Sequence, residues 1–337
     1  MSQYPLTVIQ SDMPEKWQKI LSDLVTDPKE LVQILGLDPT QAPAQDAIDE
    51  FPLKVPRPFV ARMERGNWQD PLLLQVWPSL QEQQLHPDFV TDPLAEAAAN
   101  PLPGLLHKYH GRVLLTAAPH CAIHCRYCFR RHFDYQYNSP SRRQWQHALD
   151  YIGADSTIEE VILSGGDPLA VADRQLRWLI EQLGEIPHLT TLRVHTRLPI
   201  VIPQRITPAL VELLGQSRLR CTVVVHCNHS RELDHTVAEA LSKLAANGIT
   251  LLNQSVLLAD VNDNLLALTE LSKALFSLHV LPYYLHLPDH VAGTRHFHVD
   301  APRGVELVTQ MRASLPGYLV PRLVQEEPGA AGKTLLR

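Results

Sequence analysis

From Arg112 onward, short apolar runs rich in β-branched residues alternate with longer segments in which apolar residues recur at helical spacing. Six runs predict strands, namely RVLLTAAP, EEVILSGG, TTLRVHT, RCTVVVHC, GITLLNQSVLL and HVLPYYLHL. Between them, segments such as RRQWQHALDYI, RQLRWLIEQL and HTVAEALSKLAANG predict helices. Because strand and helix alternate, the pattern predicts parallel βαβ units. Ligands of such folds bind at the carboxyl ends of the strands, where the polar residues of these runs gather.

The first hundred residues follow a different pattern. The amphipathic stretches PEKWQKILSDLV and PKELVQILGL are interrupted by the proline-containing segments DPTQAP and FPLKVPRPF. They predict short helices and contain no motif that carries chemistry. We therefore expect three parts, which are a helical N-terminal segment over residues 1–100, an α/β barrel over 101–315 and a C-terminal segment over 316–337.

Composition and charge narrow the class of protein. The chain has 337 residues, of which 45% are hydrophobic and 20% charged, as is typical of a globular protein. A net charge of −6 and the absence of a basic run disfavour nucleic acid and anionic membranes as partners. The N-terminus lacks a basic stretch followed by an apolar one, and no apolar run is long enough to cross a bilayer. We expect a cytoplasmic protein with no membrane partner.

A cysteine-rich loop follows the first predicted strand. The segment HCAIHCRYCFRR places Cys121, Cys125 and Cys128 in a CxxxCxxC arrangement. Three thiolates bind three irons of a 4Fe–4S cluster and leave the fourth iron for a small molecule. The alternative is a structural zinc site completed by a neighbouring histidine, although such sites usually pair two cysteine elements and only one occurs here. The spacing resembles the signature of the radical S-adenosylmethionine superfamily.

The second predicted strand runs into a glycine loop. EEVILSGGDPL ends in Ser164, Gly165, Gly166 and Asp167. Two glycines allow the backbone to approach a ligand closely, and a carboxylate beside them accepts hydrogen bonds from an ammonium group. Alone, the same residues are an equally good turn and helix start. In the superfamily that the cysteine loop resembles, such a loop holds the amino group of S-adenosylmethionine.

Seven stretches together resemble one family within that superfamily. They are PGLLHKYHGRVLL, CAIHCRYCFRR, LSGGDPL, HTRLPIVIPQRIT, VVHCNHSREL, LNQSVLL and YYLHLPDHVAGTRHF. In order and spacing they resemble the lysine 2,3-aminomutase family over roughly residues 50–337, and especially its shorter branch, which acts in the β-lysylation of elongation factor P. The resemblance implies an incomplete (β/α)6 barrel, in agreement with the six predicted strands.

The resemblance also implies pyridoxal phosphate as a cofactor. The family binds it to a lysine in a glycine-rich C-terminal segment, which corresponds to Lys333 in PGAAGKTLLR. Here two alanines stand among the glycines, and residue chemistry alone would make Lys333 a solvated lysine in a terminal tail. The region that contacts the cofactor phosphate corresponds to Lys108, Tyr109 and Arg112, where two cations suit a dianion.

Other residues correspond to the family's substrate and S-adenosylmethionine sites. Arg130 matches the arginine that binds the substrate carboxylate, an interaction that guanidinium makes bidentately. Asp289 and Glu326 match the two acids that bind the distal ammonium of lysine, although longer members have aspartate at the second position. Two acids there disfavour glutamate as a substrate. His226 and Gln254 match positions near S-adenosylmethionine.

The implied activity is an isomerase reaction, the conversion of L-α-lysine to β-lysine, as the (R) isomer in the shorter branch. A flavodoxin or ferredoxin would supply an electron to the cluster, and a ligase of the elongation factor P pathway would use the product. Two alternatives stay open from the residues. One is a radical S-adenosylmethionine enzyme that acts on another small amino acid without pyridoxal phosphate, and the other is a zinc-stabilised binding module.

Overall fold

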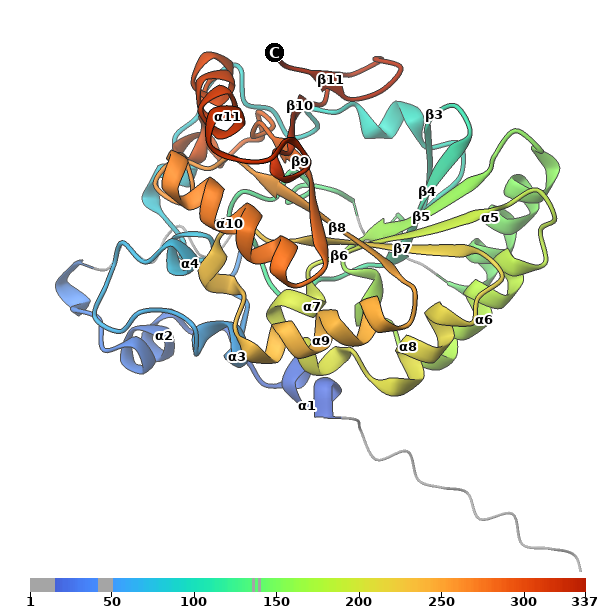
Figure 1. Cartoon of the computed structure of the whole chain (residues 1–337), viewed down its shortest axis with the longest axis horizontal. Helices are drawn as coiled ribbons and strands as arrows, with labels where there is room; N and C mark the ends of the chain where they lie inside the picture. Colours follow the sequence, from blue (N-terminus) through green and yellow to red (C-terminus); the bar gives the residue numbers. More distant parts are fainter. Residues whose placement is uncertain (1–15, 42–50, 135–136, 139–140) are drawn as a thin grey trace, which may run out of the picture.

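The centre of the molecule is a single mixed sheet. The computed structural model describes residues 16–41, 51–134, 137–138 and 141–337. The sheet has nine strands in the order β11-β10-β9-β8-β7-β6-β5-β4-β3 (Figure 1). Six consecutive strands of its parallel part are, in chain order, β4 (Arg112–Ala118), β5 (Glu160–Gly165), β6 (Thr191–Thr196), β7 (Arg220–His226), β8 (Thr250–Val256) and β9 (Val280–His286). These are the six runs that the sequence predicts, so the α/β prediction is confirmed.

Three strands at or next to the edges of the sheet are absent from the prediction. β3 (Leu105–Tyr109) pairs antiparallel with β4 across a turn at Gly111, whose φ of 75° favours glycine. β10 (Arg322–Gln325) adds in parallel to β9, and β11 (Thr334–Leu335) returns antiparallel to β10. In the described chain the edge strands β3 and β11 do not pair with each other. The sheet therefore stays open, as an incomplete barrel.

The connecting helices follow one another along the outside of the curved sheet (Figure 1). They are α5 (Arg142–Ala154), α6 (Asp173–Gly184), α7 (Leu198–Val201), α8 (Pro208–Gly215), α9 (His235–Ala246), α10 (Leu265–Ser277) and α11 (Ala301–Ser314). The three helical segments named from the sequence are α5, α6 and α9. Side chains cap several of their first turns, because Ser141, Asp234, Asn264 and Asp300 each accept a hydrogen bond from a free backbone N–H. Among the described residues, no helix combines the length and apolar character needed to cross a bilayer.

The N-terminal segment packs against the sheet rather than apart from it. Its two amphipathic stretches form helices, as predicted, and a two-stranded ladder was not predicted. The elements are α1 (Lys16–Ser22), β1 (Leu24–Val25), α2 (Pro28–Leu35), β2 (Val55–Pro56), α3 (Arg57–Val60) and α4 (Pro71–Leu74). Trp17, Phe59 and Leu72 are buried in the same hydrophobic core as the strands. Burial of this apolar surface fixes the segment beside the strand ends.

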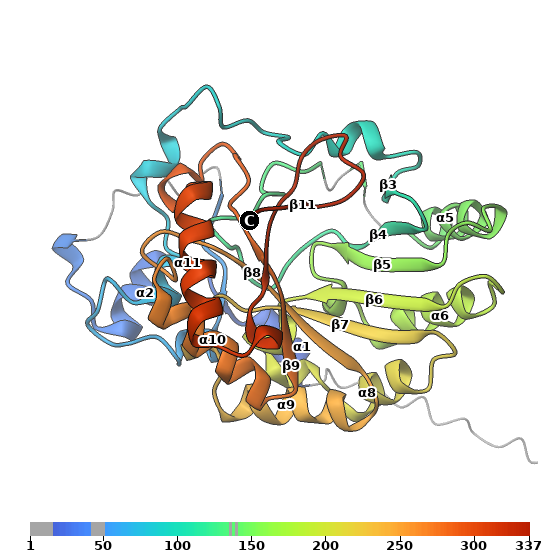
Figure 2. The same ribbon diagram turned by 45° about the horizontal axis from the view of Figure 1, so that its top comes forward.

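A few polar contacts span the opening between the two edges of the sheet. The C-terminal segment arches over the strand ends toward the part of the chain that carries β3 (Figure 2). There the Tyr109 hydroxyl donates to Glu326 Oε1 at 3.1 Å, and Lys108 Nζ lies 3.8 Å from the same oxygen. Glu326 follows β10 directly, so these contacts join the residues at one edge to those at the other.

Candidate functional site

One pocket at the carboxyl ends of the strands brings all the predicted site residues together. Its volume is about 390 Å³. The residues predicted from the sequence that line it are Lys108, Tyr109, Arg112, Cys121, Cys125, Cys128, Arg130, Ser164, Gly165, Gly166, Asp167, His226, Gln254, Asp289, Glu326 and Lys333. They come from segments more than 200 positions apart, and parallel strand order gathers them at one edge. Their individual roles stay predictions.

The cysteine loop follows β4, and its three cysteines are half-buried along the wall of the pocket. Burial, followed by repulsion from the neighbouring thiols, raises the pKa of Cys121 well above its ordinary value and that of Cys128 to about 11. Such thiols lose their protons when a metal binds them. In the part of the chain that the structure describes, no three His, Cys, Asp or Glu side chains are already gathered as metal ligands. Three thiols in one loop are nevertheless the donor set that an iron–sulfur cluster takes.

The glycine loop packs directly against the cysteine loop. Gly166 N donates to Ala118 O at 2.8 Å, and Asp167 N donates to His120 O at 3.0 Å. A Cβ on Gly166 would lie 2.3 to 2.6 Å from backbone atoms of His120, which leaves no room for a side chain. Gly165 has a φ of 106°. The glycines thus serve the contact between the two loops, in addition to any contact with a ligand.

The carboxylate of Asp167 is already fully engaged. Its oxygens accept hydrogen bonds from Thr196 Oγ1 at 2.6 Å and from the backbone N–H groups of Leu169, Arg197 and Leu198 at 2.7 to 3.0 Å. Asp167 therefore ties the glycine loop to the end of β6. An ammonium group at this loop would meet backbone carbonyls and Ser164 more readily than this carboxylate.

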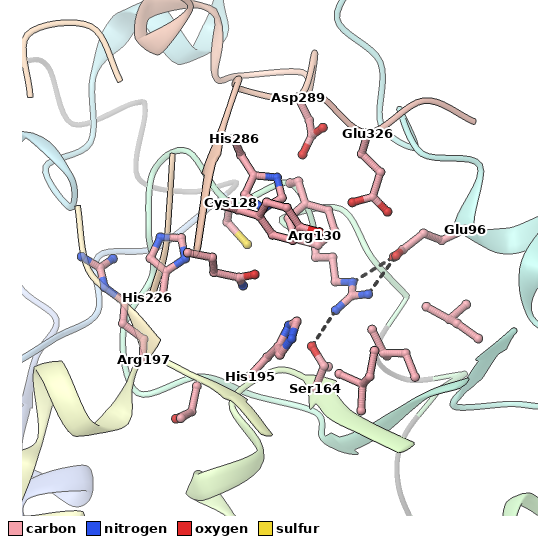
Figure 3. A pocket seen from close by; sticks show the side chains of 18 of the residues that line it. Glu96, Cys128, Arg130, Ser164, His195, Arg197, His226, His286, Asp289 and Glu326 are labelled. Atoms are coloured by element: carbon pink, nitrogen blue, oxygen red, sulfur yellow. Dashed lines mark hydrogen bonds and ion pairs between the residues drawn. The ribbon is translucent and has the colours of Figure 1, made fainter. Parts of the chain in front are cut away.

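At another part of the pocket, Arg130 forms a two-pronged ion pair with Glu96. Arg130 Nε and Nη2 each donate to a Glu96 oxygen at 2.8 Å, and Nη1 donates to Ser164 Oγ at 3.2 Å (Figure 3). Burial alone would raise the pKa of Glu96, but Arg130 and then Lys108 more than offset it and hold that pKa below its ordinary value. The fork of Arg130 thus already binds the carboxylate of Glu96.

Two acids and the C-terminal lysine lie next to this ion pair, since Lys108 Nζ is 3.5 Å from Glu96 Oε1 and 3.8 Å from Glu326 Oε1. Lys333 Nζ lies 2.7 Å from Glu326 Oε2 and 5.8 Å from the centroid of the Tyr284 ring. Asp289 and Glu326 extend into the same space from neighbouring segments (Figure 3). Burial, followed by repulsion from Glu326, raises the pKa of Asp289 to about 7. Both acids are therefore placed to bind a positive charge that enters the pocket.

A buried polar network lies beside the cysteine loop. The Tyr127 hydroxyl lies 3.0 Å from His226 Nε2, and Arg197 Nη1 donates to that hydroxyl at 2.8 Å. Gln75, at the end of α4, and Glu232, in the loop after β7, contact the other side of the same guanidinium. Burial lowers the pKa of His226 well below its ordinary value, so this imidazole is neutral.

The sequence did not single out several residues of the pocket. They are Glu96, His195, Arg197, Tyr284 and His286. A signal for four of them was present, because His195 and Arg197 lie at the carboxyl end of β6 and Tyr284 and His286 at that of β9. Glu96 belongs to the N-terminal segment and reaches the pocket through ion pairs with Arg130 and Lys108, which no local pattern indicates.

Comparisons with known proteins agree with this arrangement. The Radical SAM superfamily profile matches residues 115–269. The chain is 49% identical over 324 residues to the L-lysine 2,3-aminomutase of Escherichia coli K12, which covers 96% of this chain and 94% of that protein. It is 48% identical to the Haemophilus influenzae protein of the same name, over 95% of each. The Clostridium subterminale protein is 37% identical, over 82% of this chain and 66% of that one.

Solved structures show a weaker likeness. Streptococcus suis SuiB bound to its precursor peptide has a TM-score of 0.48 and 12% identity, over 62% of this chain and 48% of that one. The sequence relatives are much more similar, and they leave the zinc-stabilised binding module without support. On their identity and coverage, this chain belongs to the lysine 2,3-aminomutase family of radical S-adenosylmethionine proteins.

Proposed function

We propose that the protein is an isomerase that moves the amino group of L-lysine from the α-carbon to the β-carbon. The observation that carries the proposal is the set of residues that line one pocket. A three-cysteine loop, an arginine fork, an acid pair and Lys333 all line it. The names of the relatives support lysine as the substrate.

Three cofactors fit the residues of the pocket. Cys121, Cys125 and Cys128 would hold a 4Fe–4S cluster, and Lys333 would hold pyridoxal phosphate. S-adenosylmethionine would lie among Ser164, Gly165, Gly166, His226 and Gln254, and the cofactor phosphate among Lys108, Tyr109 and Arg112. When bound, the cluster and S-adenosylmethionine supply a radical that removes and returns hydrogen, and pyridoxal phosphate supplies the π system across which nitrogen migrates.

The chain's own side chains imitate both ends of a bound lysine. Glu96 presents a carboxylate to the Nε–Nη2 edge of Arg130, so a substrate carboxylate would meet the Nη1 side that Ser164 shares. Lys333 presents an ammonium to Glu326. A guanidinium and a carboxylate that already bind these two groups suit a substrate with a carboxylate at one end and an ammonium at the other.

The protein's remaining task is to orient the substrate and to exclude water. The buried imidazoles of His195, His226 and His286 have pKa values well below the ordinary value, chiefly through burial, and therefore stay neutral. Neutral groups add no positive charge that would repel the lysine ammonium. The arching C-terminal segment covers the strand ends and limits access of solvent to the reacting atoms.

Resemblance to the shorter branch of the family adds four finer features to the proposed function. They are the (R) configuration of the product, a role in β-lysylation of elongation factor P, a flavodoxin or ferredoxin as electron donor, and a cytoplasmic location. The high coverage of the Escherichia coli and Haemophilus influenzae relatives supports the resemblance to that branch. Chiral analysis of the product, and a coupled assay with a β-lysine ligase and elongation factor P, test the first two.

The central experiment is an anaerobic assay of the cluster-reconstituted protein. It contains S-adenosylmethionine, pyridoxal phosphate, dithionite and L-lysine, and chromatography separates α-lysine from β-lysine. We expect β-lysine from the wild type and none from Lys333→Ala, with Lys243→Ala, an exposed lysine on α9, as the matched control. Cleavage of S-adenosylmethionine without β-lysine would reject lysine as the substrate and would favour the alternative reaction without pyridoxal phosphate.

A further inference from the structure

Arg197 makes the closest polar contact to a cysteine of the predicted cluster loop. It follows β6 directly and is 6% exposed. Its Nη1 donates to Cys125 Sγ at 2.7 Å and to the Tyr127 hydroxyl at 2.8 Å. Its backbone N–H donates to Asp167 at 2.7 Å, which ties the residue to the glycine loop. A permanently charged guanidinium is thus fixed against one sulfur from a rigid part of the sheet.

The other face of this guanidinium is held from two different segments. Nη2 donates to Gln75 Oε1 at 2.6 Å and to Glu232 Oε2 at 3.1 Å. Glu232 has no exposed surface, and it accepts further hydrogen bonds from the backbone N–H groups of Asn228 and His229 at 2.9 and 3.1 Å. Glu232 is therefore a fixed counter-ion of Arg197. In this ion pair the guanidinium, and not the carboxylate, faces Cys125.

Such a contact changes the energetics of a bound cluster. One-electron reduction adds a negative charge to the cluster, and a cation at hydrogen-bond distance from a ligand sulfur stabilises that charge. Burial strengthens this effect, because little water screens it. We infer that Arg197 is a positioning residue that holds Cys125 toward the cluster and raises the cluster's reduction potential. This inference rests on the proposed function, since it requires the cluster.

The orientation of the ion pair predicts an order of reduction potentials. E232Q keeps the cation against the sulfur and removes the more distant anion, so the reduction potential should rise above that of the wild type. R197Q/E232Q removes both charges and the contact with Cys125. Since the lost cation is the nearer charge, the reduction potential should then fall below that of the wild type. A role limited to packing would move both variants in the same direction or not at all.

The test is an anaerobic redox titration of the reconstituted proteins, followed by the EPR signal of the reduced cluster. Iron and sulfide contents are measured on the same samples. R205Q/D173N is the matched control, since Arg205 is fully buried and pairs with Asp173 at 2.6 Å without lining the pocket. Its reduction potential should equal that of the wild type. Neutralising both members of a pair in the two double variants avoids leaving an unpaired buried charge, while in E232Q the guanidinium keeps its hydrogen bonds to Gln75 and Cys125.

The outcomes separate this inference from the proposed function. Potentials in the order E232Q, wild type, R197Q/E232Q, from highest to lowest, support the inference. Fully loaded R197Q/E232Q with the potential of the wild type overturns it and leaves the isomerase proposal intact. If that variant does not take up a cluster, E232Q alone decides, and an unchanged or lower potential overturns the inference. A wild-type protein that binds no cluster rejects the proposed function itself.

Discussion

Replacing Asp289 with asparagine should stabilise the cofactor-free protein while weakening its hold on lysine. The pKa of Asp289 is raised from its ordinary value of 3.8 to about 7, chiefly by burial and then by Glu326. No hydrogen bond to its carboxylate from the described residues offsets this. The ionised form is therefore costly in the folded protein, by about 4 kcal/mol at pH values above the folded-state pKa.

The sign of the pH dependence follows from the direction of the pKa change. Between about pH 4 and pH 7 the folded protein retains a proton on Asp289 that the unfolded chain has lost, so its stability falls as the pH rises through this window. Asn at position 289 does not titrate, so the stability of Asp289→Asn does not fall in this way. Its advantage over the wild type in the free energy of unfolding should thus grow by about 3 kcal/mol between pH 5 and pH 8.

Urea unfolding of the cofactor-free proteins at both pH values measures this difference. Asp150→Asn, at an exposed position of α5, is the matched control and should change little. In the loaded enzyme, Asp289→Asn should raise KM for lysine because one of the two acids near the ammonium is lost. An Asp289→Asn advantage that is no larger at pH 8 than at pH 5 would refute the reasoning, since the pocket would then impose no cost on the carboxylate.

Two further predictions concern other contacts of the pocket. Lys333→Ala should make the cofactor-free protein bind L-lysine about fivefold more tightly in calorimetry, because Glu326 loses an ammonium partner worth about 1 kcal/mol; equal affinities would contradict this. Gly166→Ala should lose cluster content and melt at a lower temperature, because a Cβ there meets the His120 backbone. Gly153→Ala is its control, because a Cβ at that helix position meets no atom within 4 Å and should stabilise α5 by about 1 kcal/mol. Normal cluster loading in Gly166→Ala would show that the two loops need not pack so closely.

The core of the fold could be predicted because strands such as β6 and β8 bury one face completely, and β5 and the middle of β7 bury both. A β-branched run such as that of β7 (Arg220–His226) predicts a strand from its own residues, without knowledge of the strands that pair with it. β3 (Leu105–Tyr109) and β10 (Arg322–Gln325) lie near the edges of the sheet, are short and include charged residues. Their pairing depends on the neighbouring strand, and no local pattern reveals it.

The same distinction applies to the site. Family motifs and strand ends predicted the lining residues, and the structure gathers them in one pocket. Motifs did not reveal which partners those residues have. Asp167 was expected to meet an ammonium, whereas its carboxylate binds Thr196 and backbone N–H groups. Glu96 and Gln75 come from a segment without a motif, and only tertiary contacts bring them to Arg130 and Arg197. Pairings of this kind depend on the assembled fold.

The contacts across the open edge of the sheet also give each carboxylate oxygen of Glu326 a different partner. One of its oxygens accepts from Tyr109 on β3, while the other binds Lys333 on its own segment. On the proposed function, pyridoxal phosphate would take Lys333, which would leave the second oxygen for the ammonium of a substrate while the first kept its hydrogen bond from Tyr109. Cofactor binding would then have to precede the binding of lysine at this carboxylate.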